Sequence, residues 1–360
     1  MTKREAFLKA IHNEQVDELV WAPNFDYWLA VNSAEGTVPK DFVGMSRNDI
    51  VRAIGGTIWN RSGALNTIID PSVKQTNYRE GENIVYEIET PVGNVRQVYL
   101  KTEGSHRSHY LSEHYIKNLD DLKVMKYIAE ATSFEANYAP AKQALQDTGD
   151  DGVVLLWGFS VPFIQFAKMD AGYMNGFYMW ADHKEEVDGL IEAYHKQYMA
   201  GFKLLADAPG DIIQSGDNMD GVMISPAIFK EYAIPYYQEA KKILGTSKVF
   251  EGHWCGRTDN LLSITPGCGL DAVEAIVTKP MSGITVTEAL DLLNGEVVMQ
   301  GGIPAVLVCE EGGTNEDFER YIEKTILPLK GRKGFLLGMS DNVPPNADFE
   351  RVRRVAELIA

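Results

Sequence analysis

The sequence has few cysteines, no long apolar run and too few basic residues to balance its acidic ones. Its 360 residues include three cysteines, an odd number that is typical of reduced thiols rather than of a disulfide framework. No stretch approaches the roughly 18 apolar residues that cross a membrane, and the first residues lack the basic start and apolar centre of a signal peptide. We therefore expect a cytoplasmic protein without a membrane segment.

The shortage of positive charge also limits the partners. Lys and Arg number 34 and Asp and Glu 51, which gives a net charge of -17. Binding to nucleic acid or to an anionic membrane is not expected, because phosphates would be repelled over most of such a surface. A protein partner with a basic face is compatible with this charge. The sequence leaves the oligomeric state open, a homodimer included.

Glycine-rich phosphate loops are also absent, although the second part of the chain alternates strands and helices. The predicted strands are 153–158, 211–218, 248–255, 270–276, 297–302 and 334–340, and the predicted helices are 183–205, 226–244, 259–264, 284–293, 316–327 and 348–359. Short connections between them favour parallel strands. With two strand candidates upstream, the count reaches eight. We predict an α/β fold, a (β/α)8 TIM barrel; a doubly wound open sheet is the alternative, which the missing phosphate loops disfavour.

The barrel is expected to be one domain of residues 1–360, with regular βα units over 119–360. Residues 1–118 are expected to hold a short helix over 2–13, early strands and an antiparallel β-hairpin insertion, whose strands 84–90 and 95–101 alternate apolar and polar residues. Three histidines follow the hairpin without the spacing of a His-Glu-x-x-His metal motif, so we interpret them as surface or hairpin-edge residues: His106, His109 and His114.

The segment around His253 and Cys255 is the strongest candidate for chemistry. If both lie on a strand, their side chains point the same way, and an imidazole and a thiol so placed can bind one zinc ion. Glu251 shares that face but lies too far along the strand to grip the same ion, so we expect it to orient His253 from behind. The alternative is that the two residues are simply a packed pair.

Other polar residues follow the ends of predicted strands, where a barrel of this kind carries its chemistry. Asp217 and Asp341 are predicted catalytic residues that accept hydrogen bonds from a substrate or serve as ligands, the alternative being that they cap the next helices. Asn218 and Arg257 are predicted substrate contacts. Cys309 lies in the loop after strand 297–302, from which it could reach the same end of the barrel.

Several motifs together resemble the uroporphyrinogen decarboxylase superfamily over nearly the whole chain. They are the segments 115–123, 224–235, 252–256 (Gly-His-Trp-Cys-Gly) and 267–271 (Gly-Cys-Gly-Leu-Asp). Within that superfamily, the His-x-Cys pair is similar to that of corrinoid-linked methyltransferases, in which His, Cys and a second, distant Cys bind catalytic zinc. Here the last strand carries Gly338, Met339 and Ser340 where that distant Cys is expected. The candidates for the third ligand are Cys309, Asp341 and Glu251, in that order.

The resemblance implies methyl transfer between a small-molecule methyl donor and cobalamin. The Asp-x-His-x-x-Gly run of corrinoid carriers is absent, so the cobalamin is expected on a separate corrinoid protein. The sequence looks closest to the O-demethylase type, whose methyl donor is an aryl methyl ether. The alternatives are a coenzyme M-type thiol methyltransferase, a non-catalytic subunit of a corrinoid complex, and a uroporphyrinogen decarboxylase. The last is disfavoured because residues 20–28 replace the Arg-rich loop of the decarboxylases, which leaves Arg257 and Arg61 as the obvious cations.

We further predict that aromatic residues of the early loops select the substrate. Tyr27, Trp28 and Trp59 lie near strand ends and outside the shared motifs. An aryl ether offers little beyond a flat ring, so a pocket would recognise it by stacking, worth about 0.5–1.5 kcal/mol for each aromatic pair. The alternative is that these rings only pack the barrel.

Overall fold

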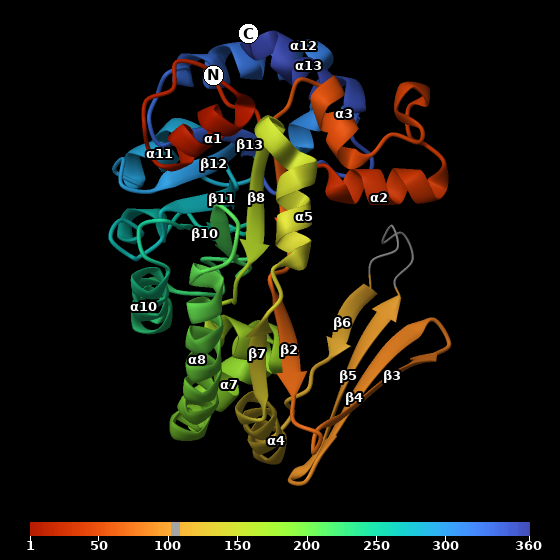
Figure 1. The fold of residues 1–360 in the computed structure, drawn as a ribbon, viewed down its shortest axis with the longest axis vertical. Helices are drawn as coiled ribbons and strands as arrows, with labels where there is room; N and C mark the ends of the chain where they lie inside the picture. The colour runs from red at the N-terminus through yellow and green to blue at the C-terminus, as the bar shows by residue number, and fades with distance from the viewer. Residues whose placement is uncertain (102–108) are drawn as a thin grey trace. The chain divides into compact units, whose positions relative to one another are not determined.

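The computed structural model describes residues 1–101 and 109–360, and these form two compact units (Figure 1). The first unit comprises residues 1–64, 138–157 and 209–360, and the second comprises 65–137 and 158–208. The expected subdivision of the chain into residues 1–118 and 119–360 is a prediction that these units do not test. That residues 1–360 act as one domain stays a prediction.

The first unit is built on seven parallel strands. In spatial order they are β1 (Ile58–Ser62), β8 (Gly152–Trp157), β9 (Ile212–Ser215), β10 (Val249–His253), β11 (Ala272–Ile276), β12 (Val298–Ile303) and β13 (Phe335–Met339). Residues 20–22 occupy the eighth position. On one side, Ala22 N donates to Leu337 O of β13 (2.9 Å), and on the other Thr57 N donates to Trp21 O (2.7 Å) just before β1. The two edges of the sheet are thus linked, and the predicted (β/α)8 barrel is confirmed.

Strands β9, β11, β12 and β13 are buried at every residue, which is why their sequences are largely apolar. The first inward-facing side chains of the barrel strands form one core cluster with helix α1 (Lys3–Ile11), which packs there through Phe7 and Ile11. A capping box between Thr2 and Glu5 fixes the start of α1. The amino-terminal end of the barrel is therefore filled with apolar side chains, and polar groups are left to the opposite end, which we call the mouth.

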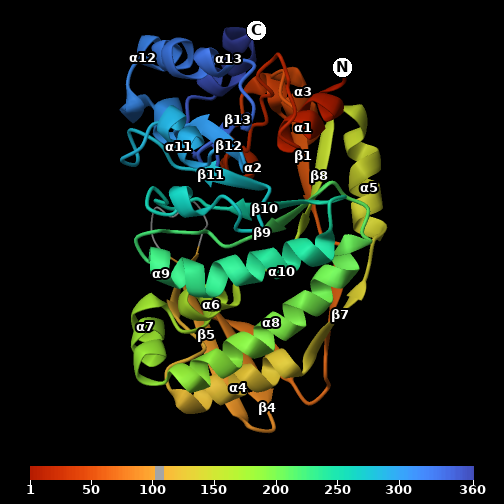
Figure 2. The same ribbon diagram turned by 90° about the vertical axis from the view of Figure 1, so that its left-hand side faces the viewer.

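Helices surround this sheet in the first unit. They are α1, α2 (Asp26–Glu35), α3 (Arg47–Ala53), α5 (Ala139–Thr148), α9 (Pro226–Ile228), α10 (Ile234–Leu244), α11 (Val286–Leu292), α12 (Asn315–Tyr321) and α13 (Phe349–Ile359). Helix α10 lies beside β10 (Figure 2), and Tyr237 contacts Phe250 with 5.9 Å between ring centroids. The predicted helix 226–244 is interrupted by a π turn over Phe229–Ala233, and the predicted helix 259–264 is only a short turn over Leu262–Ile264.

The second unit combines antiparallel strands with helices, of which α8 (Lys184–Ala206) is the longest. Its strands are β2 (Leu65–Ile69) paired with β7 (Thr132–Ala136), and a sheet of β3 (Lys74–Glu80), β4 (Asn83–Thr90), β5 (Gly93–Lys101) and β6 (His109–Glu113). Its helices are α4 (Leu119–Glu130), α6 (Pro162–Ile164), α7 (Tyr173–Asp182) and α8 (Lys184–Ala206). The predicted hairpin is confirmed as β4 and β5.

Two of the three histidines after the hairpin can be placed. His109 lies on β6 and pairs with Lys101, and the Nδ1 atom of His114 lies 2.9 Å from Met169 O. His106 lies outside the described residues. Over the part of the chain that the structure describes, no helix combines the length and apolar character needed to cross a membrane.

Candidate functional site

A pocket opens at the mouth of the barrel, where several strands contribute one side chain each. Its volume is about 280 Å³, and it is lined by Arg61 of β1, Trp157 of β8, Gln214 of β9, His253 of β10, and Gly216, Asn218 and Asp341 from the loops that follow β9 and β13. Three predicted site residues, His253, Asn218 and Asp341, therefore meet in one place. Cys255 contacts two of these lining residues.

The imidazole of His253 is fixed from one side and open on the other. Its Nδ1 atom forms a short contact with the carboxylate of Glu274, which stands opposite it on β11 and is buried. Its Nε2 atom lies 3.8 Å from Oδ1 of Asp341. Burial alone would lower the pKa of His253, but the neighbouring Glu274 carboxylate and Cys255 thiol raise this pKa to about 11.

Cys255 lies beyond the end of β10, yet its thiol remains close to the imidazole and contributes to the pKa of His253. Its Sγ donates to Oδ1 of Asn218 (3.2 Å). The two loops come together at Gly256, where N donates to Met219 O (3.0 Å) and where an added Cβ would lie 2.6 Å from that oxygen. Glycine is thus needed for the close approach that sets Asn218 beside Cys255.

Two of the pocket residues have a positive φ angle, a backbone conformation that residues other than glycine rarely adopt. Asn218 has φ 46° and Asp341 has φ 87°. Such conformations each cost about 1–3 kcal/mol and tend to occur at functional sites. Both side chains are therefore directed by a strained backbone in the loops after β9 and β13 rather than by regular strands.

Glu251 does not orient His253, contrary to the sequence-based expectation. Its Oε2 accepts a hydrogen bond from Gln214 Nε2 (2.8 Å), whereas its Oε1 is buried without a partner among the described residues. Burial and the nearby Glu274 raise the pKa of Glu251 to about 8. Glu274 holds His253 instead, because the residue that contacts a strand side chain is set by the register of the neighbouring strand, which a single strand's sequence does not reveal.

The donor set at the mouth suits zinc in part. The His253 Nε2 and Cys255 Sγ atoms are the nitrogen and sulfur donors that zinc accepts, and Glu274 supplies the carboxylate that commonly supports a metal-bound histidine. Across residues 1–101 and 109–360, however, no three His, Cys, Asp or Glu side chains form a ready-made metal cluster. Asp341 is the nearest carboxylate to the open face of His253.

Cys309 does not join this group. Its Sγ lies 3.7 Å from Ala305 O and 3.8 Å from Asn346 Oδ1, so the thiol is held within its own loop. Asp217 is also directed elsewhere: it is buried and accepts a hydrogen bond from Tyr237 Oη (2.6 Å), and it does not line the pocket. Arg257 is exposed and likewise absent from the lining.

The aromatic wall of the pocket differs from the predicted one. Trp28 is 2% exposed and stacks on Phe349 at 4.0 Å, and Trp59 is 1% exposed with Nε1 donating to Pro23 O (3.3 Å). Neither these two nor Tyr27 lines the pocket. Trp157, which is 48% exposed, forms the wall. It is the last residue of β8, whereas the sequence analysis placed the end of that strand one residue further on.

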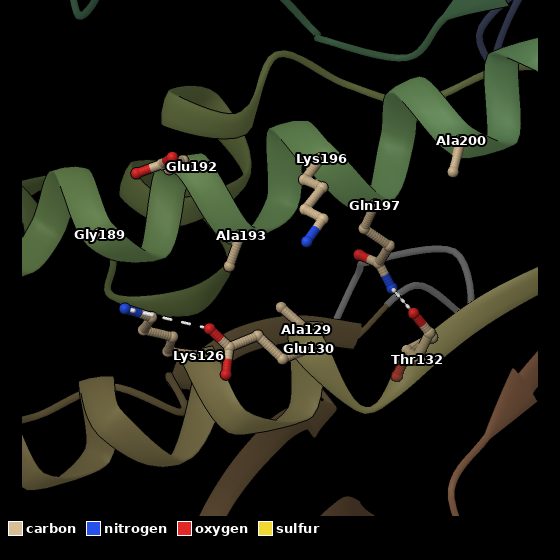
Figure 3. A pocket seen from close by; sticks show the side chains of 10 residues that line it. All are labelled: Lys126, Ala129, Glu130, Thr132, Gly189, Glu192, Ala193, Lys196, Gln197 and Ala200. Atoms are coloured by element: carbon tan, nitrogen blue, oxygen red, sulfur yellow. Dashed lines mark hydrogen bonds and ion pairs between the residues drawn. The ribbon is translucent and has the colours of Figure 1, made fainter.

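A second hollow, of about 590 Å³, lies within the second unit between α4 and α8 (Figure 3). Figure 3 shows Lys126 directed at Glu130, Gln197 donating to Thr132 O, and Lys196 extending into the space between the helices. The described residues that line it include neither a histidine nor a cysteine. It therefore offers no soft metal ligand, and the mouth of the barrel remains the candidate site.

Comparisons with known proteins agree with this fold. A methyltransferase from Methanosarcina mazei superposes with a TM-score of 0.62 at 13% identity, over 99% of this chain and 98% of that one. At such identity the likeness shows the fold alone. A mandelate racemase/muconate lactonizing enzyme-like protein from Rubrobacter xylanophilus reaches a TM-score of 0.21 at 11% identity, over 77% and 87% of the two chains, which is too low to support an argument. A search of curated proteins returns no match.

The family assignment comes from the sequence. The family model described as Uroporphyrinogen decarboxylase (URO-D) matches residues 105–360, which include β8 to β13, His253, Cys255 and Glu274. The resemblance noted from the motifs is thereby confirmed. With most of its length matched and its strands closed into a barrel, this chain belongs to the uroporphyrinogen decarboxylase (URO-D) family.

Proposed function

We propose that the protein is a zinc-dependent methyltransferase that moves a methyl group between a small-molecule donor, an aryl methyl ether, and the cobalamin of a separate corrinoid protein. The observation that carries the proposal is the arrangement of His253. Its Nδ1 is held by a buried carboxylate, its Nε2 is open to the pocket, and the Cys255 thiol is beside it. The family and the methyltransferase from Methanosarcina mazei that shares the fold support it.

Zinc would be held by His253 and Cys255, with Asp341 as the first candidate for a third ligand. Zinc in this position would act as a Lewis acid that stabilises the negative charge on an ether oxygen as its methyl group leaves. Glu274 would keep the imidazole in place with Nε2 turned to the pocket. Asn218, which accepts from the Cys255 thiol, would fix the direction of that sulfur.

The remaining pocket residues would bind the donor. Trp157 offers an exposed ring face on which an aromatic ether can stack. The volume of about 280 Å³ accommodates a single substituted ring. Decarboxylation of a tetrapyrrole is disfavoured, because that substrate is larger and carries several carboxylates, whereas the described residues that line this pocket include one arginine.

The first test measures the zinc content of the purified protein. We expect the purified protein to contain zinc, and His253→Ala to lose most of it while keeping the circular dichroism of the parent. A parent protein with zinc at background level would remove the proposal.

The second test is turnover. A panel of methoxylated aromatics with a reduced corrinoid protein should give demethylated products and methylated cobalamin. A zinc-containing protein without turnover on any ether, but with transfer between methylcobalamin and a thiol, would instead identify the coenzyme M-type reaction. Release of CO₂ from uroporphyrinogen would identify a decarboxylase.

A further inference from the structure

Next to Asn218 in the chain, Asp217 forms a buried hydrogen bond that plays no part in the proposed chemistry. Asp217 is 1% exposed, and its Oδ2 accepts from the Oη of Tyr237 on α10 (2.6 Å). Burial and the nearby Asp217 carboxylate raise the pKa of Tyr237 well above its ordinary value, so its hydroxyl keeps its proton and remains the donor. Breaking such a bond would leave a buried acceptor with one partner fewer, which is costly away from water. The pair is therefore a firm link between α10 and the loop after β9.

Tyr237 is held in place by two aromatic rings and one backbone contact. Its ring centroid lies 5.9 Å from that of Phe250 on β10 and 6.3 Å from that of Phe229. The backbone contact is with Gly269, which has φ 106° and where an added Cβ would lie 2.6 Å from the carbonyl carbon of Tyr237. Only glycine permits this approach. The Gly-Cys-Gly-Leu-Asp segment 267–271, singled out in the sequence, thus lets α10 come close enough for Tyr237 to reach the loop after β9.

Beyond Asp217, the same loop reaches the Cys255 thiol. Asn218 has φ 46°, and such a conformation persists only where the surroundings hold it. Its Oδ1 accepts from Cys255 Sγ (3.2 Å), and the carbonyl oxygen of the next residue, Met219, accepts from the backbone N of Gly256 (3.0 Å). The loop is thus fixed before Asn218 by the Asp217 side chain and after it by the Met219 backbone. If the first of these were lost, the Asn218 amide would be free to turn away from the sulfur.

We propose that Asp217 and Tyr237 are positioning residues, which act through Asn218 to hold the Cys255 sulfur in the direction in which it binds a metal. The metal in this statement rests on the proposed function. The placement of the sulfur does not, because it can be measured on the metal-free protein. An amide offers an acceptor to a thiol and a donor to a thiolate, so Asn218 suits the sulfur with or without its proton. Asp217 thereby supports the site from outside the pocket instead of touching a substrate.

A double-mutant cycle on protein freed of metal by a chelator tests the placement of the sulfur. The rate of Cys255 alkylation by iodoacetamide is followed by mass spectrometry of its peptide, which separates it from Cys268 and Cys309. Tyr237→Phe removes only a hydroxyl and should speed this alkylation several-fold, because Asn218 then holds the sulfur less firmly. Asn218→Gly should do the same, since glycine adopts the same φ without the amide.

The double variant decides whether Tyr237 acts through Asn218. Adding Tyr237→Phe to Asn218→Gly should change the alkylation rate little, because the effects of residues that act through one another are not additive. Rates that multiply in the double variant would overturn the proposal, and so would an unchanged rate in a folded Tyr237→Phe protein.

The same four proteins are then compared in zinc affinity by competition with a chromophoric chelator. Tyr237→Phe should weaken zinc binding by about tenfold or more, as the loss of a group that supports a ligand does, with little further loss in the Asn218→Gly background. Cobalt(II) in place of zinc gives a spectroscopic readout, and its absorption bands should shift in the same way in both single variants. A lower stability with unchanged affinity and unchanged bands would show a purely structural role and overturn the proposal.

Two further variants serve as controls. Tyr194→Phe breaks a matched buried bond, from Tyr194 Oη to Asp170 Oδ2 (2.8 Å) in the second unit, and should leave both the alkylation rate and the zinc affinity unchanged. Asp217→Asn keeps an acceptor for the Tyr237 hydroxyl, so it should lose less zinc affinity than Tyr237→Phe, and it also serves if Tyr237→Phe does not fold. A loss of more than about tenfold in Asp217→Asn would show that the charge of Asp217 matters rather than its hydrogen bond, against the proposal.

The two readouts separate this proposal from the proposed function. Alkylation rates that are coupled between Tyr237 and Asn218, in a protein that binds no zinc, would support the positioning role and remove the zinc-dependent function. Zinc binding with rates and affinities that are not coupled would leave that function standing and overturn the positioning role.

Discussion

The Asp341 carboxylate and the His253 imidazole face each other at the barrel mouth, with 3.8 Å between Oδ1 and Nε2. That nitrogen is the one that Glu274 leaves open. The pair changes the order of candidates for a third zinc ligand, because Asp341 stands at the open face whereas Cys309 is held by Ala305 and Asn346. Glu251 is turned toward Gln214.

The choice of third ligand can be decided by metal affinity. We expect Asp341→Ala to weaken zinc binding by at least about tenfold, since loss of even a supporting group costs 10–100-fold. Cys309→Ser should leave the affinity near that of the parent. Competition with a chromophoric chelator measures both, and the reverse ranking would return Cys309 to the site.

The contact between the Glu274 carboxylate and the His253 imidazole gives a second prediction. Glu274→Gln should weaken zinc binding by about 10–100-fold, because the amide holds the imidazole less firmly and withdraws its negative charge. Glu251→Gln should change the affinity far less, since Glu251 contacts Gln214 and not His253. The same chelator titration serves for this pair of isosteric changes. Similar losses in the two variants would show that the buried carboxylates act together.

The two tryptophans beside Arg61, Trp59 and Trp157, should differ in their effects on stability. Trp59→Ala removes a fully buried ring and should lower the free energy of unfolding by about 3–5 kcal/mol. Trp157→Ala removes a half-exposed ring and should cost under about 1 kcal/mol. Urea denaturation followed by far-ultraviolet circular dichroism compares them. A large loss from Trp157→Ala would mean that this ring serves the core rather than the pocket.

The second unit should carry a pH-dependent stability. Asp170 accepts hydrogen bonds from Tyr194 Oη (2.8 Å) and Gln165 Nε2 (2.9 Å), and its complete burial raises its pKa from 3.8 to about 7. Between these values the folded chain keeps a proton that the unfolded chain has released. The contribution of Asp170 to the free energy of unfolding is therefore highest below pH 3.8, falls as the pH rises toward 7 and levels off above it, by about 4 kcal/mol at most.

Asp170→Asn has no such proton to lose. The melting temperature of the parent minus that of Asp170→Asn should therefore decrease as the pH is raised from about 4 to about 7 and stay constant above that. Taking the difference removes the contribution of other titrating groups such as Glu251. A difference that is flat over the whole range would show that Asp170 is ionised in the folded protein.

The barrel strands were predictable because their burial leaves a direct trace in the sequence. Strands β10 to β13 begin and end within two residues of the expected positions, since parallel strands covered on both faces are continuous apolar runs. Most elements of the second unit lack such an apolar run in their sequence. Every residue of β3 is exposed, so its sequence lacks alternation, and the long helix α8 gives no indication that it belongs with α4 rather than with the barrel.

The site could be predicted only where residues of suitable chemistry also have a telling spacing in the sequence. His253 and Cys255 stood out because soft ligands two residues apart are uncommon on a strand. Glu274 could not be found in this way, because its contact with His253 depends on the register between β10 and β11. Trp157 was missed by a one-residue error at a strand end. Trp28 and Trp59 were assigned to the pocket from their position near strand ends, which does not distinguish a ring that faces the core from one that faces solvent.

At Asn218 and Asp341 the backbone has a left-handed conformation. A residue that makes the fold more stable at these positions would remove a side chain that the site uses. Glycine at either position would relieve a conformational cost of about 1–3 kcal/mol, and it would also delete the amide beside Cys255 or the carboxylate beside His253. A selection for thermal resistance alone should therefore recover glycine at these two positions. A selection that also demands turnover should reject it, and the two residues provide a place where engineering for robustness and engineering for catalysis diverge.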